Sequence, residues 1–337
     1  MGKQLDAVQN RYGDDINRAL RQALDGQNNP RNFLEMMRYQ LGIARNPSET
    51  APGGGGKRFR PALCLLACEA AGGQPSSALQ AAAAIELLHN FSLIHDDIED
   101  HDPSRRHRPT VWKVWGEPHA INAGDGMFAL SCQTLTSMKG PSDLTLELAH
   151  ALFHTSLQLT SGQYLDMTFE AESHVSTDQY LDMINMKTAS LIEFALWCGG
   201  RIAGAECNTC DRLRDFGLSL GRAFQIYDDI QGIWATSEQT GKETNKDLVN
   251  RKKTLPVLIA WERATREQTD TLNRFFDRRE GSIGRVRDVL DATDARVEST
   301  AIGRRYLEKG LEALRAAHLL SPYGQELEEI ATEITGQ

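Results

Sequence analysis

The sequence predicts an all-helical protein that folds as a bundle. Apolar residues recur at spacings of three and four along most of the 337 residues, which is the period of a helix with one buried face. Ala, Leu, Glu, Gln and Arg dominate these segments, and runs of alternating β-branched residues are few. We therefore expect helices throughout the chain, an all-α fold.

The composition is typical of a globular protein with a substantial core. Hydrophobic residues make up 40% of the chain and charged residues 25%. The Gly- and Pro-rich stretches are too short to be flexible interdomain linkers. We expect one domain over 1–337, with N-terminal helices in 1–52, a motif-bearing catalytic core in 53–258 and C-terminal helices in 259–337.

The charge balance argues against some partners. The chain has 37 basic and 46 acidic residues, a formal charge of -9, which disfavours sequence-independent binding to nucleic acid or to an anionic membrane. No apolar run approaches membrane-spanning length, and the N-terminus lacks a signal-peptide core. The six cysteines fit a reducing compartment, and the Cys207–Cys210 pair lacks two further zinc ligands. We expect a cytoplasmic protein.

Gly, Pro and polar clusters divide the chain into helices. The predicted interruptions lie at 46–56, 72–77, 101–118, 139–143 and 234–251. Between them, the helices predicted at 77–100 and 211–233 are apolar along much of their length, and each ends in a carboxylate pair. This recurrence suggests two facing, pseudo-symmetric helices in one bundle.

The first carboxylate pair lies in HDDIED, residues 95–100. Asp96 and Asp100 are one turn apart and share a helix face, with Asp97 and Glu99 turned aside. Stacked carboxylates repel unless a cation lies between them, and Mg²⁺ prefers such oxygen ligands when it also holds phosphate. An isolated motif of this kind is more often a solvated helix end. Here it follows an apolar stretch, and it recurs 132 residues later at Asp228.

Basic residues surround the two acidic helix ends. A glycine run precedes Lys57, and the following helix is expected to present Lys57 and Arg60 one turn apart. His89 lies two turns before Asp96, on nearly the same face, where a lone histidine is more often a core residue than a ligand. Further basic residues stand at Arg105, Arg106, Lys187, Lys242 and Lys252.

Six ordered motifs together resemble the trans-isoprenyl diphosphate synthases, also called polyprenyl synthetases. They are GGKRFRP (55–61), HDDIED (95–100), RR followed by PT (105–110), KTA (187–189), FQIYDD (224–229) and the GK, DL and KKTLP elements of 241–256. The resemblance covers 53–258 and is closest in motif to bacterial geranylgeranyl diphosphate synthases. It implies an isoprenoid-synthase helical bundle around a deep central cavity, normally a homodimer.

The resemblance also implies the chemistry. It makes the chain a Mg²⁺-dependent prenyltransferase that joins isopentenyl diphosphate to an allylic diphosphate, which is dimethylallyl, geranyl or farnesyl diphosphate, and releases diphosphate. Three magnesium ions are implied, with Asp96 and Asp100 on one wall and Asp228 opposite. Asp97 and Asp229 complete the two catalytic aspartate pairs. Three divalent cations and fixed basic groups stabilise charge on the leaving diphosphate, and a dry cavity positions the carbocation.

The family pattern assigns roles to the remaining polar residues. The allylic diphosphate would be held by Arg105, Lys187 and Lys252, with Lys242 closing over the leaving group. Isopentenyl diphosphate would be bound by Lys57, Arg60, His89 and Arg106. Thr188 and Gln225 would line the space where the allylic cation forms.

The chain departs from the family pattern at several positions. Gly232 stands where many members have a third aspartate, which we expect to be tolerated because the first aspartate of that motif is the one expected to touch metal. His107 replaces a usual Gly, and Asn245 with Lys246 replaces a small pair before Asp247. These changes affect loop geometry and remove no charge that the mechanism needs.

Product length is expected to depend on Phe91 and Ser92, five and four residues before Asp96. An aromatic residue followed by a small one resembles synthases of the twenty-carbon product. A helix phenylalanine is more commonly a core residue. We expect geranylgeranyl diphosphate, with farnesyl and twenty-five-carbon or longer products as the alternatives.

Three other classes of protein are alternatives. The pairs Glu86/His89 and Glu147/His150 have the ExxH spacing of di-iron bundles but leave the aspartates and basic residues unexplained. A terpene cyclase of the same fold needs no second diphosphate site, whereas this chain retains the residues of that site, Lys57, Arg60, His89 and Arg106. A non-catalytic regulatory subunit could lose its metal ligands, which are retained here.

Overall fold

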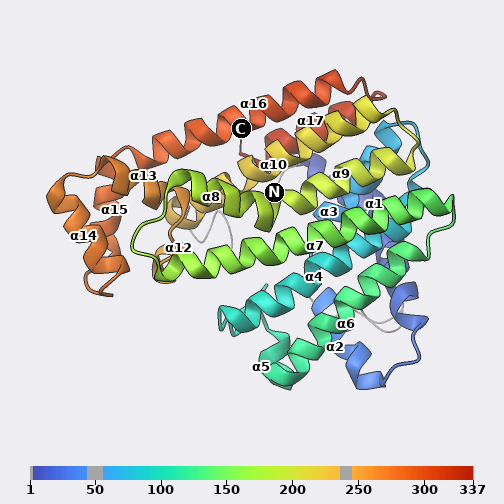
Figure 1. The fold of residues 1–337 in the computed structure, drawn as a ribbon, viewed down its shortest axis with the longest axis horizontal. Coiled ribbons are helices and arrows are strands. Elements are labelled where there is room, and N and C mark those ends of the chain that lie inside the picture. The colour runs from blue at the N-terminus through green and yellow to red at the C-terminus, as the bar shows by residue number, and fades with distance from the viewer. Residues whose placement is uncertain (1–2, 44–55, 236–244, 337) are drawn as a thin grey trace.

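The computed structural model describes residues 3–43, 56–235 and 245–336, and helices dominate it, as predicted (Figure 1). The N-terminal half contains α1 (Lys3–Asp25), α2 (Arg31–Leu41), α3 (Phe59–Ala70), η1 (Pro75–Ala78), α4 (Leu79–Glu99), α5 (Val111–Trp115), α6 (Glu117–Thr136) and α7 (Ser142–Ala171). The C-terminal half contains α8 (Thr177–Ile184), η2 (Asn185–Ala189), α9 (Ser190–Ile202), α10 (Cys207–Trp234), α12 (Lys246–Val249), α13 (Leu255–Arg263), α14 (Arg266–Phe276), α15 (Ile283–Ala292), α16 (Ala295–Ala316) and α17 (Tyr323–Ile334).

The two helices that carry the carboxylate pairs are α4 and α10. Residues 81–88 of α4 are buried on every side, because the small side chains of its alanine run let α1, α3 and α6 pack closely around it. The sequence predicted that α4 and α10 face each other. In the structure they are connected through α9, which contacts both of them. α10 continues along α16, which lies beside it in Figure 1.

Two hydrophobic clusters form the interior. The larger one is formed by side chains of α1, α2, α3, α4, α6, α7 and α9, of the first half of α10, and of α17. The smaller one is formed by side chains of α8, of the second half of α10, and of α13, α14 and α15. The last three helices lie at one end of the molecule (Figure 1). Because α10 contributes to both clusters, its acidic end is fixed where the two clusters meet.

The segment 101–118 is more ordered than the predicted interruption. It contains a two-residue hairpin of β1 (Ser104–Arg105) and β2 (Arg108–Pro109), with Arg106 and His107 in the turn at positive φ, and then α5. The hairpin places Arg105 and Arg106 beside the end of α4. Within the described ranges, no helix is both long enough and apolar enough to cross a membrane.

Candidate active site

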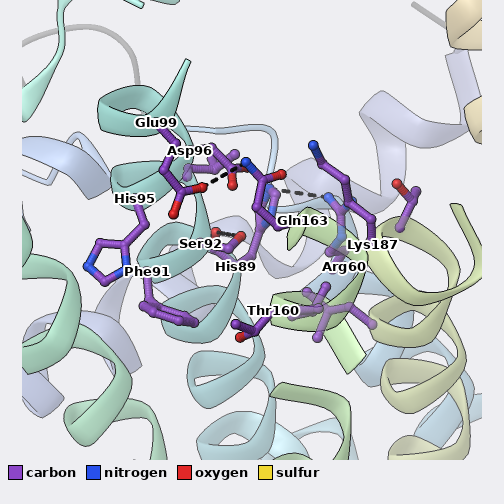
Figure 2. A pocket seen from close by; sticks show the side chains of 14 residues that line it. Arg60, His89, Phe91, Ser92, His95, Asp96, Glu99, Thr160, Gln163 and Lys187 are labelled. Carbon is purple, nitrogen blue, oxygen red and sulfur yellow. Dashed lines mark hydrogen bonds between the residues drawn. The ribbon is translucent and has the colours of Figure 1, made fainter. Parts of the chain in front are cut away.

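A pocket opens between the C-terminal end of α4, the middle of α7 and the η2–α9 segment (Figure 2). Charged and amide groups occupy its upper part, whereas Phe91 and Thr160 lie in its lower part. Its lining consists of Arg60, His89, Phe91, Ser92, Leu93, His95, Asp96, Glu99, Leu159, Thr160, Gln163, Lys187, Thr188 and Leu191. The pocket therefore has a polar part above an apolar part.

The first aspartate pair divides between the pocket and the interior. Asp96 faces the pocket, and its burial raises its pKa to about 6 in spite of the positive charges of Lys187 and Arg105. Asp97 is 1% exposed and accepts a hydrogen bond from Arg105 Nε at 2.6 Å. Burial raises its pKa to about 6 as well, against the effect of Arg105. Arg105 therefore pairs with a carboxylate that faces away from the pocket.

Two predicted lysines meet at an aspartate that the sequence analysis missed. Lys187 Nζ donates to Asp166 Oδ2 at 2.5 Å. Lys252 Nζ lies 3.5 Å from the same oxygen and 3.5 Å from Asp100 Oδ2. Burial opposes ionisation of Asp166, but the two lysines outweigh it and lower its pKa below the usual range. Burial also opposes the charge on Lys252, yet Asp166, Asp100 and other carboxylates raise its pKa.

Glu99 lies differently from the sequence prediction. It was expected to turn aside, but it lines the pocket and accepts a hydrogen bond from Gln163 Nε2 at 2.8 Å (Figure 2). The expectation was wrong because the pocket spans more than the face shared by Asp96 and Asp100: α7 approaches α4 from the side where Glu99 projects. Gln163 Oε1 is buried and makes no hydrogen bond within the described structure.

The basic residues at the start of α3 also differ from the prediction. The helix begins at Phe59, so Lys57 precedes it, is exposed, and does not form a helical pair with Arg60. Arg58, between them, adopts a left-handed conformation and turns inward, where it donates to Glu86 Oε1 at 2.8 Å. This buried ion pair anchors the segment and directs Arg60 into the pocket.

Arg60 and His89 form the basic wall of the pocket. Arg60 Nη1 lies 3.2 Å from His89 Nε2, and Arg60 Nε is buried without a partner in the described structure. Burial lowers the pKa of Arg60 to about 10. Burial, followed by the charges of Arg60, Arg106 and other arginines, lowers the pKa of His89 well below its usual value. Arg106 packs against Gly56, next to this wall.

The π-helical segment η2 brings Lys187 and Thr188 to the pocket. It fits between two glycines, because a Cβ on Gly162 of α7 would collide with Lys187 and one on Gly221 of α10 would collide with Ala189. A π-helical turn inside a helix commonly marks a functional site.

Thr188 is connected to the second aspartate pair. Its Oγ1 donates to Gln225 Oε1 at 2.8 Å, and Gln225 Nε2 donates to Asp229 Oδ1 at 2.8 Å. Tyr180 also donates to Asp229, at 2.5 Å. Burial and then Asp247 raise the pKa of Asp229 to about 8, against the effect of these donors. Asp228 precedes it and is partly exposed, and the described structure places neither aspartate in the lining of the pocket.

The departure at Gly232 has a local explanation. A Cβ on Gly232 would collide with Asp247 Oδ2, so the carboxylate of Asp247 occupies the space where a side chain at position 232 would begin. An acidic group is therefore present beside the second motif although the third aspartate is missing. Sequence reasoning noted both positions without connecting them.

The other predicted residues fall in different places. Phe91 and Ser92 line the pocket, and Ser92 Oγ donates to His89 O at 2.9 Å. Lys242 lies outside the described residues. The di-iron alternative is wrong, because Glu86 pairs with Arg58 and Glu147 pairs with Arg201. Over the described ranges, no group of three or more His, Cys, Asp or Glu side chains is placed to hold a metal ion. Any ion here would need oxygen atoms from a ligand or water as well.

Comparison with known proteins gives a consistent family. The model of the polyprenyl synthetase family matches residues 43–293. A (2E,6E)-farnesyl diphosphate synthase of Mycobacterium tuberculosis is 34% identical over 306 residues, covering 87% of this chain and 83% of the relative. A geranylgeranyl diphosphate synthase of the same organism is 39% identical over 254 residues, covering 75% and 72%.

The fold is also that of solved structures. The geranylgeranyl pyrophosphate synthetase of Pyrococcus horikoshii superimposes with a TM-score of 0.89 at 30% identity, covering 99% of this chain and 98% of the other. The sequence relatives are named for products of two different lengths, so the comparisons leave the length of this chain's product open.

Proposed function

Because the chain belongs to the polyprenyl synthetase family and is a trans-prenyltransferase, we propose that it condenses isopentenyl diphosphate with an allylic diphosphate, chiefly to the twenty-carbon product, and releases diphosphate. One observation carries this proposal. A single pocket combines a basic wall at Arg60 and His89, an acidic group at Asp96 with Lys187, and an apolar lower part. Two anionic headgroups and one hydrocarbon chain match these three parts.

The allylic diphosphate belongs on the side of Asp96, Asp100 and Lys187. The family generally uses Mg²⁺, and the donor set fits it: carboxylate oxygens one turn apart, with too few protein ligands to complete a shell without phosphate. We assign Asp96, Asp100 and Asp228 as the ligands of three ions. Bound Mg²⁺ would stabilise the negative charge that develops on the leaving diphosphate. Lys187 and Lys252, together with Lys242 and Arg105, would donate to its oxygens.

Isopentenyl diphosphate belongs on the basic wall. Arg60 and His89 line the pocket, and several arginines around His89 keep its surroundings positive, so an anion would be bound there directly. Lys57 and Arg106 would complete this site. Gln225 supports Thr188, whose hydroxyl would face the allylic cation, and the departing diphosphate would accept the final proton.

We also propose that the protein is a homodimer that uses the exposed face of α7. Large apolar side chains recur there at helical spacing: Leu146, Phe153, Leu157, Tyr164 and Met167. Leu146 is 71% and Tyr164 is 67% exposed, and an apolar stripe of this length on one helix is typical of a helix-pairing surface. Light scattering on the purified protein tests the mass of the assembly.

Product analysis tests the function and the chain length together. The protein is incubated with Mg²⁺, isopentenyl diphosphate and each allylic diphosphate in turn, and the products are separated by length. We expect mainly the twenty-carbon product. Phe91→Ala should lengthen it and Ser92→Phe should shorten it, because both residues line the pocket. If both variants give the wild-type distribution, these residues do not set the length.

A further inference from the structure

The side of Phe91 that faces away from the pocket contacts α6. Phe91 lines the pocket, but its ring also contacts Phe128 of α6, with ring centres 5.4 Å apart and planes at 47°. On its other flank the ring meets His95 edge to face, at 5.1 Å and 72°. Phe91 is therefore the middle ring of three, and Figure 2 shows Phe91 and His95 leaving α4 on the side away from Lys187.

This stack is part of an antiparallel contact between α4 and α6. Ser131 Oγ of α6 donates to Ala84 O at 2.7 Å, Phe128 meets Phe91, and Gly124 faces His95. The four residues from Phe128 to Gly124 on α6 match the four residues from Phe91 to His95 on α4, and the Ser131 bond lies two turns further along α4. The two helices are held in register by this ladder, so the position of Phe128 is fixed relative to the pocket.

Gly124 is the member of the ladder that makes room for His95. A Cβ on Gly124 would collide with the imidazole of His95, whose Nε2 lies 3.3 Å from Ile121 O. Any larger residue at 124 would displace the His95 side chain away from α6. His95 lines the pocket, so the displaced ring would move into the pocket. The imidazole would then crowd Phe91 and the lower pocket.

We propose that Phe128 is a specificity-determining residue of the prenyl transfer, which sets product length by supporting Phe91 from behind. A growing hydrocarbon chain presses on the pocket side of the Phe91 ring. Phe128 contacts the ring but does not line the pocket, so it blocks the rotation of Phe91 towards α6 that would lengthen the pocket. Offset and tilted ring pairs of this kind are favourable contacts in protein interiors. The inference rests on the proposed function, since it concerns the length of its product.

The test measures product length for Phe128→Ala, Phe128→Leu and Gly124→Ala, with Mg²⁺, isopentenyl diphosphate and farnesyl diphosphate. Phe128→Ala should lengthen the main product by at least one five-carbon unit, and Phe128→Leu should lengthen it by less. Gly124→Ala should shorten it. The double variant Phe91→Ala/Phe128→Ala should make products no longer than Phe91→Ala alone, because Phe128 acts through Phe91.

The matched control is Phe276→Ala, which removes a ring from the Trp261–Phe276 cluster at the distant end of the molecule. It should leave product length unchanged. A wild-type distribution in Phe128→Leu, or additive lengthening in the double variant, overturns the role of Phe128. If Phe128→Ala does not fold, Phe128→Leu decides. Failure of the wild type to form any prenyl product would instead overturn the proposed function, so the two failures are distinguishable.

Discussion

The two sides of the pocket handle charge differently. On the basic side, Arg60, His89 and Arg106, burial and then mutual repulsion lower the pKa values of Arg60 and His89. The other side, called the mixed side, carries both acidic and basic groups: Asp96, Asp100, Asp166, Lys187 and Lys252. Its two lysines are already paired with Asp166 and Asp100. An anion can bind the basic side directly. On the mixed side it must bring cations with it or displace a carboxylate from a lysine.

The largest loss of activity is expected when a carboxylate is removed from the mixed side. Asp96→Ala should lower turnover roughly a thousandfold, the scale on which loss of one preorganised electrostatic contact acts. The fold should persist, because Asp96 packs at the pocket surface. Chelation of the wild type with EDTA should have the same effect. Steady-state kinetics and thermal unfolding check both expectations.

The matched control for this variant is Asp215→Ala, which removes an exposed carboxylate of α10. It should keep wild-type turnover. Unchanged activity in Asp96→Ala, or in the presence of EDTA, would contradict a metal-dependent mixed side.

A second experiment separates the two sides by substrate. Arg60→Ala should raise KM for isopentenyl diphosphate about tenfold or more, because a hydrogen bond to a charged group contributes about 1.5–3 kcal/mol. Lys187→Ala should instead raise KM for the allylic diphosphate. Titrating each substrate at saturating levels of the other measures both constants. Equal effects of both variants on both substrates would mean that the assignment of the sides is wrong.

The third prediction concerns the charge balance of the mixed side. Asp166→Asn keeps the shape of the side chain but removes the charge that both lysines share. The two ammonium groups are then no longer neutralised by a competing carboxylate, and KM for the allylic diphosphate should fall about fivefold, which is about 1 kcal/mol. KM for isopentenyl diphosphate should stay constant.

Glu147→Gln is the control for Asp166→Asn, since it neutralises an exposed carboxylate that pairs with Arg201. Exposed pairs contribute little, so its kinetics should match the wild type. A loss of activity towards both substrates in Asp166→Asn would indicate a structural role instead.

Local patterns in the sequence predicted the fold and pointed to Asp96, whereas the roles of the pocket-lining residues Lys187 and Thr188 came from the family resemblance. Helical periodicity and the aspartate spacing are visible within a few residues. Asp166 carried no such signal, since its role depends on η2 and the segment after α12 approaching α7. The contact depends on tertiary packing, which one sequence does not display.

The errors at Lys57 and Glu99 have the same origin. A single left-handed residue, Arg58, moves the start of α3 and separates Lys57 from Arg60. The side from which α7 approaches α4 brings Glu99 into the pocket through Gln163. Helical geometry gives the direction of a side chain, but the neighbouring helix decides what that direction faces.

The smallest expected effect is a change in the pH dependence of stability, and it comes from His89 on the basic side. Because burial and the surrounding arginines lower the pKa of His89, the unfolded chain takes up a proton near pH 6.5 while the folded protein does not. The unfolded state then binds more protons, so the free energy of unfolding falls as the pH drops below about 6.5.

His89→Gln lacks this contribution. Between pH 7.5 and 5.5, the Tm of the wild type should therefore fall by about 2 °C more than that of His89→Gln. Calorimetry at the two pH values measures the difference, and His174→Gln, at an exposed histidine outside the pocket, controls for the loss of an imidazole. Identical pH dependence of wild type and His89→Gln would mean that His89 can take up a proton in the folded protein. The effect of burial and of the arginines on His89 would then be weaker than their positions indicate, and the imidazolium would itself add a positive charge to the basic side.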